Sequence, residues 1–512
     1  MPFIFDNSYL KLSNAFYASA KGQRTPKCEY AILNRDLASS LGISLEALES
    51  EIALNILSGN TLLENAANIA MAYAGHQFGY FTMLGDGRAM LLGEVITANG
   101  TRKDLHLKGS GPTAYSRRGD GKAALGPMLR EYLISEAIHA LNIPTSRSLA
   151  VISTGEYIQR EQPQKGAVLC RVAQSHLRVG TFQYAAALSA EQPEYAHLLK
   201  ELADYAIWRH PAFHPQTPDS KGDISKVVSD QSNPYLNFYT QIVNRQALLV
   251  AKWQSVGFIH GVLNTDNTAI SGETIDYGPC AFMDVYHPQT VFSSIDHQGR
   301  YAYNNQPNMV GWNLARLAEA LMPLFDSNQD QARKLAELAI NSYIKNYESH
   351  YHQIFCEKLG ISSGPEHHET SKSIIETFLN LLQVNKLDFT ESFVWLTLVA
   401  NNDPRRDSIN ARYQTLHPWL ETWYALRETQ NINIDVANNE MMLVNPCMIP
   451  KNHLVEHALN AWTVNNDKAP FLELHDHLSA PYAYTDQRLD ALFAANNKSG
   501  GRTPQYKTYC GT

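Results

Sequence analysis

Short apolar segments with the spacing typical of β-strands recur between residues 81 and 185. Four segments share this pattern: residues 89–95, 102–108, 148–153 and 167–172. Asn99-Gly100 separates the first two and is typical of a type I′ hairpin turn. In the second segment the side chains alternate, so that His106 and Lys108 share one face. The pattern predicts a small sheet, one strand of which ends at Lys108.

Elsewhere the apolar residues recur mainly at helical spacing. Helices are predicted at residues 37–51, 61–73, 236–256, 312–324, 331–359, 389–401 and 413–427. A further helix is predicted to begin near Pro127, since proline suits the first turn, and Glu131 lies off its apolar stripe. We therefore expect an α+β fold, with a mostly-β lobe preceding a larger helical lobe.

We expect four parts along the chain. These are an N-terminal extension (1–80), a small lobe (81–185), a larger helical lobe (186–400) and a C-terminal helical extension (401–512).

Composition narrows the class of protein. The chain has 512 residues, of which 44% are hydrophobic and 18% charged, and this balance is typical of folded globular proteins. A net charge of -8 disfavours a general nucleic-acid binder. We find no apolar run of membrane-spanning length and no secretory or transit signal at the start, so we expect a cytoplasmic protein. None of the six cysteines forms a C-x-x-C pair, which disfavours structural zinc.

The richest candidate chemistry lies in residues 257–284, GFIHGVLNTDNTAISGETIDYGPCAFMD. Residues 268–270 and 273–275 are predicted as two short strands joined at Ser271-Gly272, which would bring Asn267 and Asp276 to one edge. An amide oxygen and a carboxylate together suit Mg²⁺, with phosphate oxygens completing the coordination. Protein kinases use this order of elements. The alternative is an ordinary polar loop.

One position departs from the kinase pattern. Val262 stands where a kinase carries its catalytic Asp, although His260 and Asn267 keep the usual separation. Asp266 is the carboxylate of this loop that can replace the missing base. The loop therefore predicts a kinase-like nucleotide site with altered chemistry.

Other candidate residues surround the predicted sheet. Gly85 and Gly87 can bring backbone N–H groups close to phosphate, and Arg88 adds charge. Lys108 on a strand and Glu131 on the next helix repeat the kinase ion pair.

Basic residues after these elements have competing interpretations. The loop at residues 116–122 is rich in glycine and basic residues, which suggests phosphate contact or a solvated flexible loop. Arg171 and Arg178 bracket a predicted turn and can clamp phosphate or form ordinary salt bridges.

With these motifs assembled, the sequence resembles the selenoprotein O family. The resemblance rests on FDNSYLKL, YAGHQFG, LGDGRA, LKGSGPTAYSRRGDGKAALGPMLREYL, RVAQSHLRVGTFQ, GVLNTDNTAISGETIDYGPCAFMD and the NP…IPKNHLVEHAL region, and covers nearly the whole chain. It implies a protein-kinase-like bilobal fold and transfer of AMP from ATP to Ser, Thr or Tyr hydroxyls of proteins, with Mg²⁺ or Mn²⁺. Transfer of UMP from UTP is also implied for bacterial members.

The resemblance also implies roles for individual residues. The nucleotide-binding positions are Gly85, Gly87, Arg88, Lys108, Asp120, Gly121, Arg171 and Arg178, with Glu131 as the partner of the lysine. Asn267 and Asp276 match the metal ligands, and Asp266 matches the proton acceptor. An ordinary kinase remains an alternative, as does a nucleotide-binding redox scaffold. The sequence indicates neither the oligomeric state nor the preferred donor.

A thiol switch is a further expectation. Eukaryotic members of the family carry a selenocysteine near the C-terminus, and Cys510 holds the comparable place. We call residues 257–284 the metal loop. Cys280 lies in it, two residues after Gly278, so we predict a reversible Cys280–Cys510 disulfide beside the active site. The alternative is two unrelated reduced thiols, since stable disulfides are rare in the cytosol.

Overall fold

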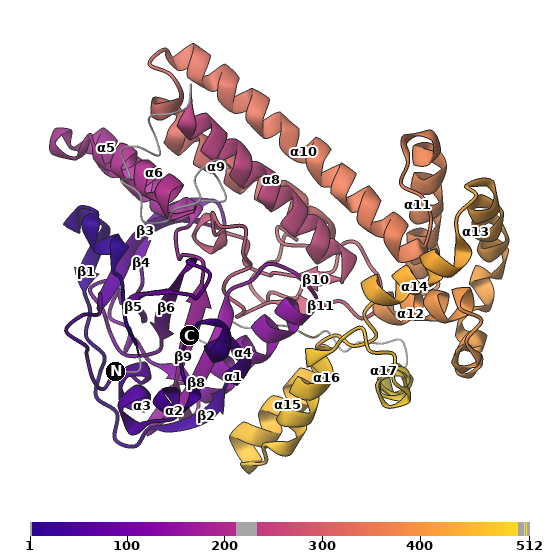
Figure 1. The fold of residues 1–512 in the computed structure, drawn as a ribbon, viewed down its shortest axis with the longest axis horizontal. Coiled ribbons are helices and arrows are strands. Elements are labelled where there is room, and N and C mark those ends of the chain that lie inside the picture. Colours follow the sequence, from indigo (N-terminus) through magenta and orange to yellow (C-terminus); the bar gives the residue numbers. More distant parts are fainter. Residues whose placement is uncertain (1–2, 211–232, 500–505, 507, 509–512) are drawn as a thin grey trace.

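A twisted antiparallel sheet forms the N-terminal part of the protein (Figure 1). The computed structural model describes residues 3–210, 233–499, 506 and 508. The sheet order is β1 (Tyr17–Ser19), β3 (Ile69–Gln77), β5 (Ala89–Ile96), β6 (Arg102–Lys108), β9 (Gln164–Ala173), β8 (Arg147–Ile158) and β2 (Glu29–Leu33). Strand β4 (Tyr80–Gly85) pairs with β3, and β7 (Ala123–Ala124) pairs with β9. The four strands predicted between residues 89 and 172 are confirmed.

Strand β6 carries Lys108 to the centre of this sheet. Lys108 is opposite Ala89 of β5 on one side and Leu169 of β9 on the other. Both neighbouring strands are mostly buried, so the lysine side chain extends from a rigid part of the molecule.

Two N-terminal predictions are wrong. Residues 69–73 belong to β3, not to a helix, because this buried segment pairs with β1, β4 and β5 at once. Apolar spacing in a short segment suits either structure, and tertiary pairing decides between them. Residues 37–51 fall in three helices, α1 (Arg35–Ser40), α2 (Leu45–Leu48) and α3 (Glu51–Leu57), and not in one. Gly42 adopts a left-handed φ of 75°, and Ser44 caps the next helix.

Helices complete the small lobe and form most of the described part of the larger lobe. They are α4 (Leu125–Ala140), α5 (Val179–Glu191), α6 (Leu198–Arg209), α8 (Pro234–Ser255), α9 (Gln306–Phe325) and α10 (Gln329–Leu359). Helix α4 packs on β8 and β9, and the long helices α8 and α10 lie side by side (Figure 1). The helices predicted at 236–256, 312–324 and 331–359 are confirmed within a few residues.

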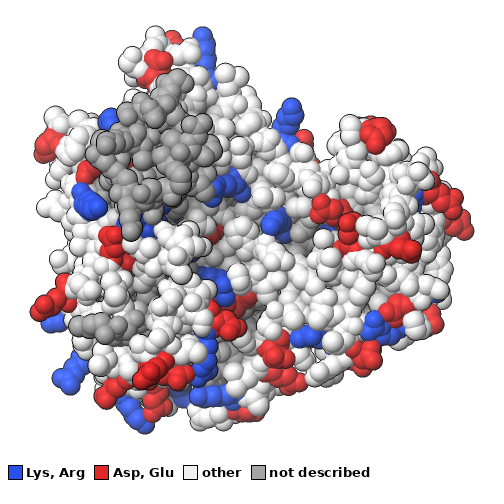
Figure 2. All heavy atoms as spheres, viewed as in Figure 1, with Lys and Arg blue, Asp and Glu red and all other residues white. Residues whose placement is uncertain are grey.

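The C-terminal region is helical, as predicted. It contains α11 (His368–Val384), α12 (Phe389–Ala400), α13 (His417–Thr429), α14 (Ile434–Val444), α15 (Asn452–Asn465), α16 (Ala469–Ser479) and α17 (Asp486–Ser499). Helices α15 and α16 pack against α4, so this region returns to the sheet. Among the described helices, none combines the length and apolar character that a membrane crossing requires. Acidic and basic side chains are interspersed over the face shown in Figure 2.

Candidate active site

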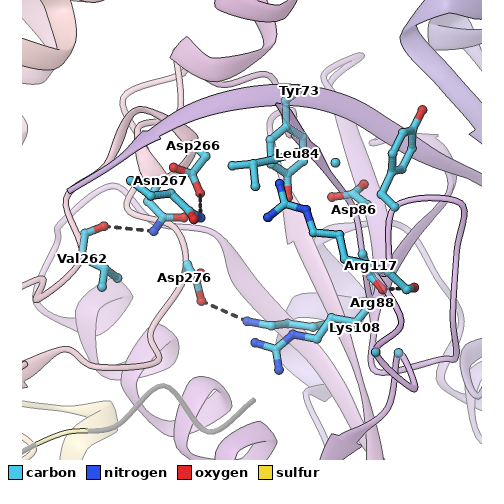
Figure 3. A pocket seen from close by; sticks show the side chains of 18 of the residues that line it. Tyr73, Leu84, Asp86, Arg88, Lys108, Arg117, Val262, Asp266, Asn267 and Asp276 are labelled. Carbon is cyan, nitrogen blue, oxygen red and sulfur yellow. Dashed lines mark hydrogen bonds and ion pairs between the residues drawn. The ribbon is translucent and has the colours of Figure 1, made fainter. Parts of the chain in front are cut away.

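A cavity of about 840 Å³ lies between the sheet and the loop at residues 257–284. Most of the predicted site residues line it: Gly85, Gly87, Arg88, Lys108, Asp120, Gly121, Arg171, Arg178, Asp266, Asn267 and Asp276 (Figure 3 labels several of them). Because these residues come from segments far apart in the sequence, the fold alone brings them to one place.

Lys108 and Glu131 form the predicted strand–helix ion pair. Lys108 Nζ lies 2.7 Å from Glu131 Oε2 and 3.0 Å from Asp276 Oδ1. Arg171 Nε donates to the other oxygen of Glu131 at 2.9 Å, so this arginine forms a salt bridge at the edge of the cavity. Burial opposes the ionisation of Glu131, but the charges of Arg171 and Lys108 outweigh it and lower its pKa.

Asp276 is held as a carboxylate in an unusual backbone conformation. Its φ is 69°, in the left-handed region that few non-glycine residues adopt. Burial opposes its ionisation, but Lys108, Arg171 and Arg88 hold its pKa far below the ordinary range. Such strained residues cluster at functional sites.

The two short strands predicted in the metal loop are absent, and this expectation was wrong. Ala269 instead forms a β-bridge with Arg178, and Thr274 forms one with Thr145. The Gly272 N–H donates to the Ala269 carbonyl, which closes the turn. The loop's backbone groups are therefore satisfied partly by turns within the loop and partly by neighbouring segments, and not by a hairpin ladder.

The loop still brings Asn267 and Asp276 to the same cavity. Asn267 Nδ2 donates to the Val262 carbonyl at 2.9 Å, which leaves its Oδ1 as an acceptor (Figure 3). No cluster of three or more His, Cys, Asp or Glu side chains suited to a metal occurs in the part of the chain that the structure describes. This donor set fits Mg²⁺, because Mg²⁺ in proteins usually keeps waters and phosphate oxygens beside one or two side-chain ligands.

Asp266 lies beside this pair in a different environment. It is 7% exposed, and its Oδ1 has no hydrogen-bond partner among the described residues. Its Oδ2 accepts a 3.4 Å hydrogen bond from Gln77 Nε2. Burial raises the pKa of Asp266, although Arg178 opposes this.

Arg178 bridges the two halves of the cavity. Its Nη1 donates to the Asp266 carbonyl at 3.1 Å, and its guanidinium lies 4.4 Å from the centre of the Tyr73 ring. A guanidinium held from several sides loses little freedom on binding an anion, which suits phosphate recognition.

Comparison with known proteins agrees with this geometry. A family model described as "Protein adenylyltransferase SelO" matches residues 2–479. The chain belongs to the SelO family. Proteins named "Protein nucleotidyltransferase YdiU" are also similar, at 48% identity. The one from Geobacillus kaustophilus aligns over 510 residues, covering 99% of each chain, and the one from Clostridium perfringens over 519 residues, covering 100% of this chain and 98% of its own.

The glycine-rich segments of this SelO-family chain allow close backbone approach. A Cβ at Gly85 would lie 2.4 Å from the Tyr115 ring, and one at Gly121 would lie 2.1 Å from the Gly111 carbonyl carbon. Asp120 pairs with Arg160 at 2.8 Å, so its carboxylate is engaged at the cavity rim. The loop at 116–122 is thus partly fixed, and not wholly solvated as the alternative interpretation had it.

Sequence reasoning missed several residues that shape the SelO site. Tyr73, Gln77 and Asp86 line the cavity, and a Cβ at Gly75 would lie 2.6 Å from Asp266 Oδ1. Behind this strand, a Cβ at Gly180 would lie 1.9 Å from the Ala74 carbonyl oxygen. The glycines within YAGHQFG and RVGTF were the available signals.

The predicted thiol pair lies partly outside the described structure. Cys280 is fully buried, and burial raises its pKa to about 12. Cys510, and with it the predicted disulfide, lies outside the described residues. Nearby, Thr508 Oγ1 donates to the Pro279 carbonyl at 2.6 Å, so this part of the chain contacts the metal loop.

Proposed function

We propose that this chain transfers AMP or UMP from ATP or UTP to Ser, Thr or Tyr hydroxyls of other proteins, using Mg²⁺ or Mn²⁺. Membership of the SelO family gives nucleotidyl transfer as the reaction class. The observation that supports the proposal best is one cavity lined by two cations, Lys108 and Arg178, by the Asn267 amide and by two carboxylates, Asp266 and Asp276.

Each carboxylate then takes a separate part in the reaction. Asp276, with Asn267, would hold the cation, which supplies charge neutralisation on the phosphates when bound. The oxygen of the acceptor hydroxyl bonds to the α-phosphorus, and Asp266 accepts the proton that this hydroxyl loses. The bond from the α-phosphorus to the bridging oxygen breaks, and pyrophosphate leaves with the bonding electrons.

The cations of the cavity hold the triphosphate during this step. Lys108 is fixed by Glu131 and can donate to phosphate oxygens without reorganisation. Arg178 is buried and retains unused N–H donors, because its Nε has no partner among the described residues. Val262 also lines the cavity at the place of the kinase base, where it cannot accept a proton.

The position of the label in the donor separates three hypotheses: nucleotidyl transfer, an ordinary kinase, and a nucleotide-binding redox scaffold without transfer. The protein is incubated with Mg²⁺, a mixture of candidate protein acceptors and ATP labelled at the α- or γ-phosphate, with [α]-labelled UTP in parallel. We expect label on protein from the α-position alone. Label from the γ-position alone would establish a kinase, and no label from either would favour the redox scaffold. The Asp266→Asn variant is the matched control for transfer by this site.

A further inference from the structure

Asp86 connects the glycine turn to four other segments of the chain. Its Oδ2 accepts hydrogen bonds from the Met71 N–H at 3.1 Å and from His106 Nε2 at 3.0 Å. Its backbone carbonyl accepts from Thr113 Oγ1 at 2.6 Å. Its Oδ1 lies 3.7 Å from Arg178 Nη2. Asp86 is 2% exposed, so this carboxylate acts inside the protein and not at its surface.

Asp86 is ionised in this setting. Burial opposes its ionisation, but His106, Arg178 and the Met71 N–H outweigh burial and hold its pKa at about 2. An ionised carboxylate only accepts hydrogen bonds, so His106 must carry its hydrogen on Nε2. The orientation of the imidazole is thereby fixed.

A second histidine holds His106 from the other side. The rings of His106 and His176 stack with their centres 4.1 Å apart, and both residues are buried. His176 Nδ1 lies 3.0 Å from Asp104 Oδ2, which anchors it to β6. His176 precedes Arg178 by two residues, so the stack joins β6 to the segment that carries the arginine.

Strand alternation gives β6 two functions on one face. Lys108, two residues after His106, reaches Glu131 and Asp276. His106 reaches Asp86 and, through it, Arg178. The same strand therefore contacts two cations of the cavity, Lys108 directly and Arg178 through Asp86.

We propose that His106 and Asp86 are positioning residues that fix the Arg178 guanidinium for binding the triphosphate of the nucleotide donor. This inference rests on the proposed function, because it assumes that the cavity takes a nucleoside triphosphate. Neither His106 nor the carboxylate of Asp86 needs to touch the nucleotide. The donor on His106 Nε2 is the essential feature, since it sets the direction of the Asp86 carboxylate facing Arg178.

Two substitutions separate the donor from the ring. His106→Phe keeps an aromatic ring for stacking but removes the donor, whereas His106→Gln loses the ring but can place an amide N–H where Nε2 was. Binding is measured by calorimetry with an ATP analogue that has a methylene bridge between the α- and β-phosphorus. We expect about tenfold weaker binding for His106→Phe, as for loss of one charge-assisted hydrogen bond, and largely restored affinity for His106→Gln.

A double-mutant cycle shows whether the effect passes through Arg178. In an Arg178→Gln background, His106→Phe should weaken binding by less than about twofold, because the group it positions is gone. Additive losses would overturn the inference, as would a His106→Gln variant no better than His106→Phe. If wild-type protein bound no nucleoside triphosphate, the proposed function would fail as well. Should His106→Phe unfold, as monitored by thermal denaturation, Asp86→Asn takes its place in the cycle with the same expectation.

Discussion

The carboxylates of the cavity show how neighbouring residues of one type acquire different chemistry. Three cations surround Asp276, and its pKa is lowered, whereas Asp266 is enclosed by the backbone of β3, and burial raises its pKa. A carboxylate that is held ionised suits a cation, and a buried carboxylate with a raised pKa suits proton transfer.

Replacing Asp276 by alanine should abolish most transfer. The variant loses a ligand of the proposed cation, while the contact between Lys108 and Glu131 does not involve residue 276. Loss of one such electrostatic stabiliser lowers kcat by about 10²–10³-fold. The measurement is transfer of α-label across a titration of Mg²⁺ and of Mn²⁺. Wild-type turnover at saturating metal would rule out the assignment.

Replacing Asp266 by asparagine should slow transfer by about 10²–10⁴-fold with little change in nucleotide affinity. The contact with Arg178 survives, because it is made by the backbone carbonyl of residue 266. Only the ionised carboxylate accepts a proton, so wild-type kcat/KM should fall as the pH drops below the raised pKa of Asp266. This acid limb should be absent from the residual activity of the variant. Parallel loss of binding and rate would instead make Asp266 a binding residue.

At the scale of elements, the site depends on how strands, a helix and a loop are fixed against each other. A charged pair, Lys108 and Glu131, links β6 to α4, and Arg171 of β9 supports it from the second oxygen of Glu131. Removing either partner leaves the other buried with a changed set of contacts.

The Lys108 and Glu131 substitutions should therefore be strongly non-additive. Lys108→Ala weakens nucleotide binding directly, and Glu131→Gln does so by releasing the lysine. When two residues act as one unit, the first substitution removes most of their joint contribution, so the second adds little further loss. We expect the double variant to lose no more than about twofold beyond the worse single variant, in binding and in kcat/KM. A loss equal to the product of the two single losses would show independent roles.

Sequence alone predicted the elements whose signals are local. The strand ending at Lys108, the helix carrying Glu131 and the spacing of Asn267 and Asp276 all appear within short windows. The residues of β3 were missed because their roles arise from distant contacts. Gln77 meets Asp266 from 189 positions away, and the apolar spacing of residues 61–73 fits a helix as well as a strand.

The hairpin predicted in the metal loop was wrong for a related reason. A turn at Ser271-Gly272 predicts a hairpin only if the flanking residues pair with each other. Here Ala269 and Thr274 pair instead with partners beside the sheet. The local sequence of a loop does not show which distant segment will satisfy its backbone groups.

At the scale of the whole molecule, a buried lysine joins the C-terminal region to the metal loop. Lys451 precedes α15 and is 2% exposed. Its Nζ lies 2.5 Å from Asp388 Oδ2, at the start of α12, and 3.5 Å from Asp284 Oδ1, at the end of the metal loop. The Lys451 ammonium thus links three segments from different parts of the chain through ion pairs.

Replacing Lys451 by methionine should destabilise the protein by about 3–5 kcal/mol, because two largely buried carboxylates lose a fully buried cation. The free energy of unfolding is measured by chemical denaturation. The matched control is Lys200→Met, which removes an exposed lysine 2.7 Å from Asp204 and should cost less than about 1 kcal/mol. Equal effects of the two substitutions would mean that Lys451 is not a structural link.

The close packing of β3 limits how the gene can vary. Gly75 lies against Asp266, and Gly180 lies against the backbone of residue 74. Every missense change in a glycine codon introduces a residue with a Cβ, so no substitution at either position leaves β3 and Asp266 where they are. We therefore expect that no amino-acid change at either of these two codons is neutral for the position of the catalytic segment.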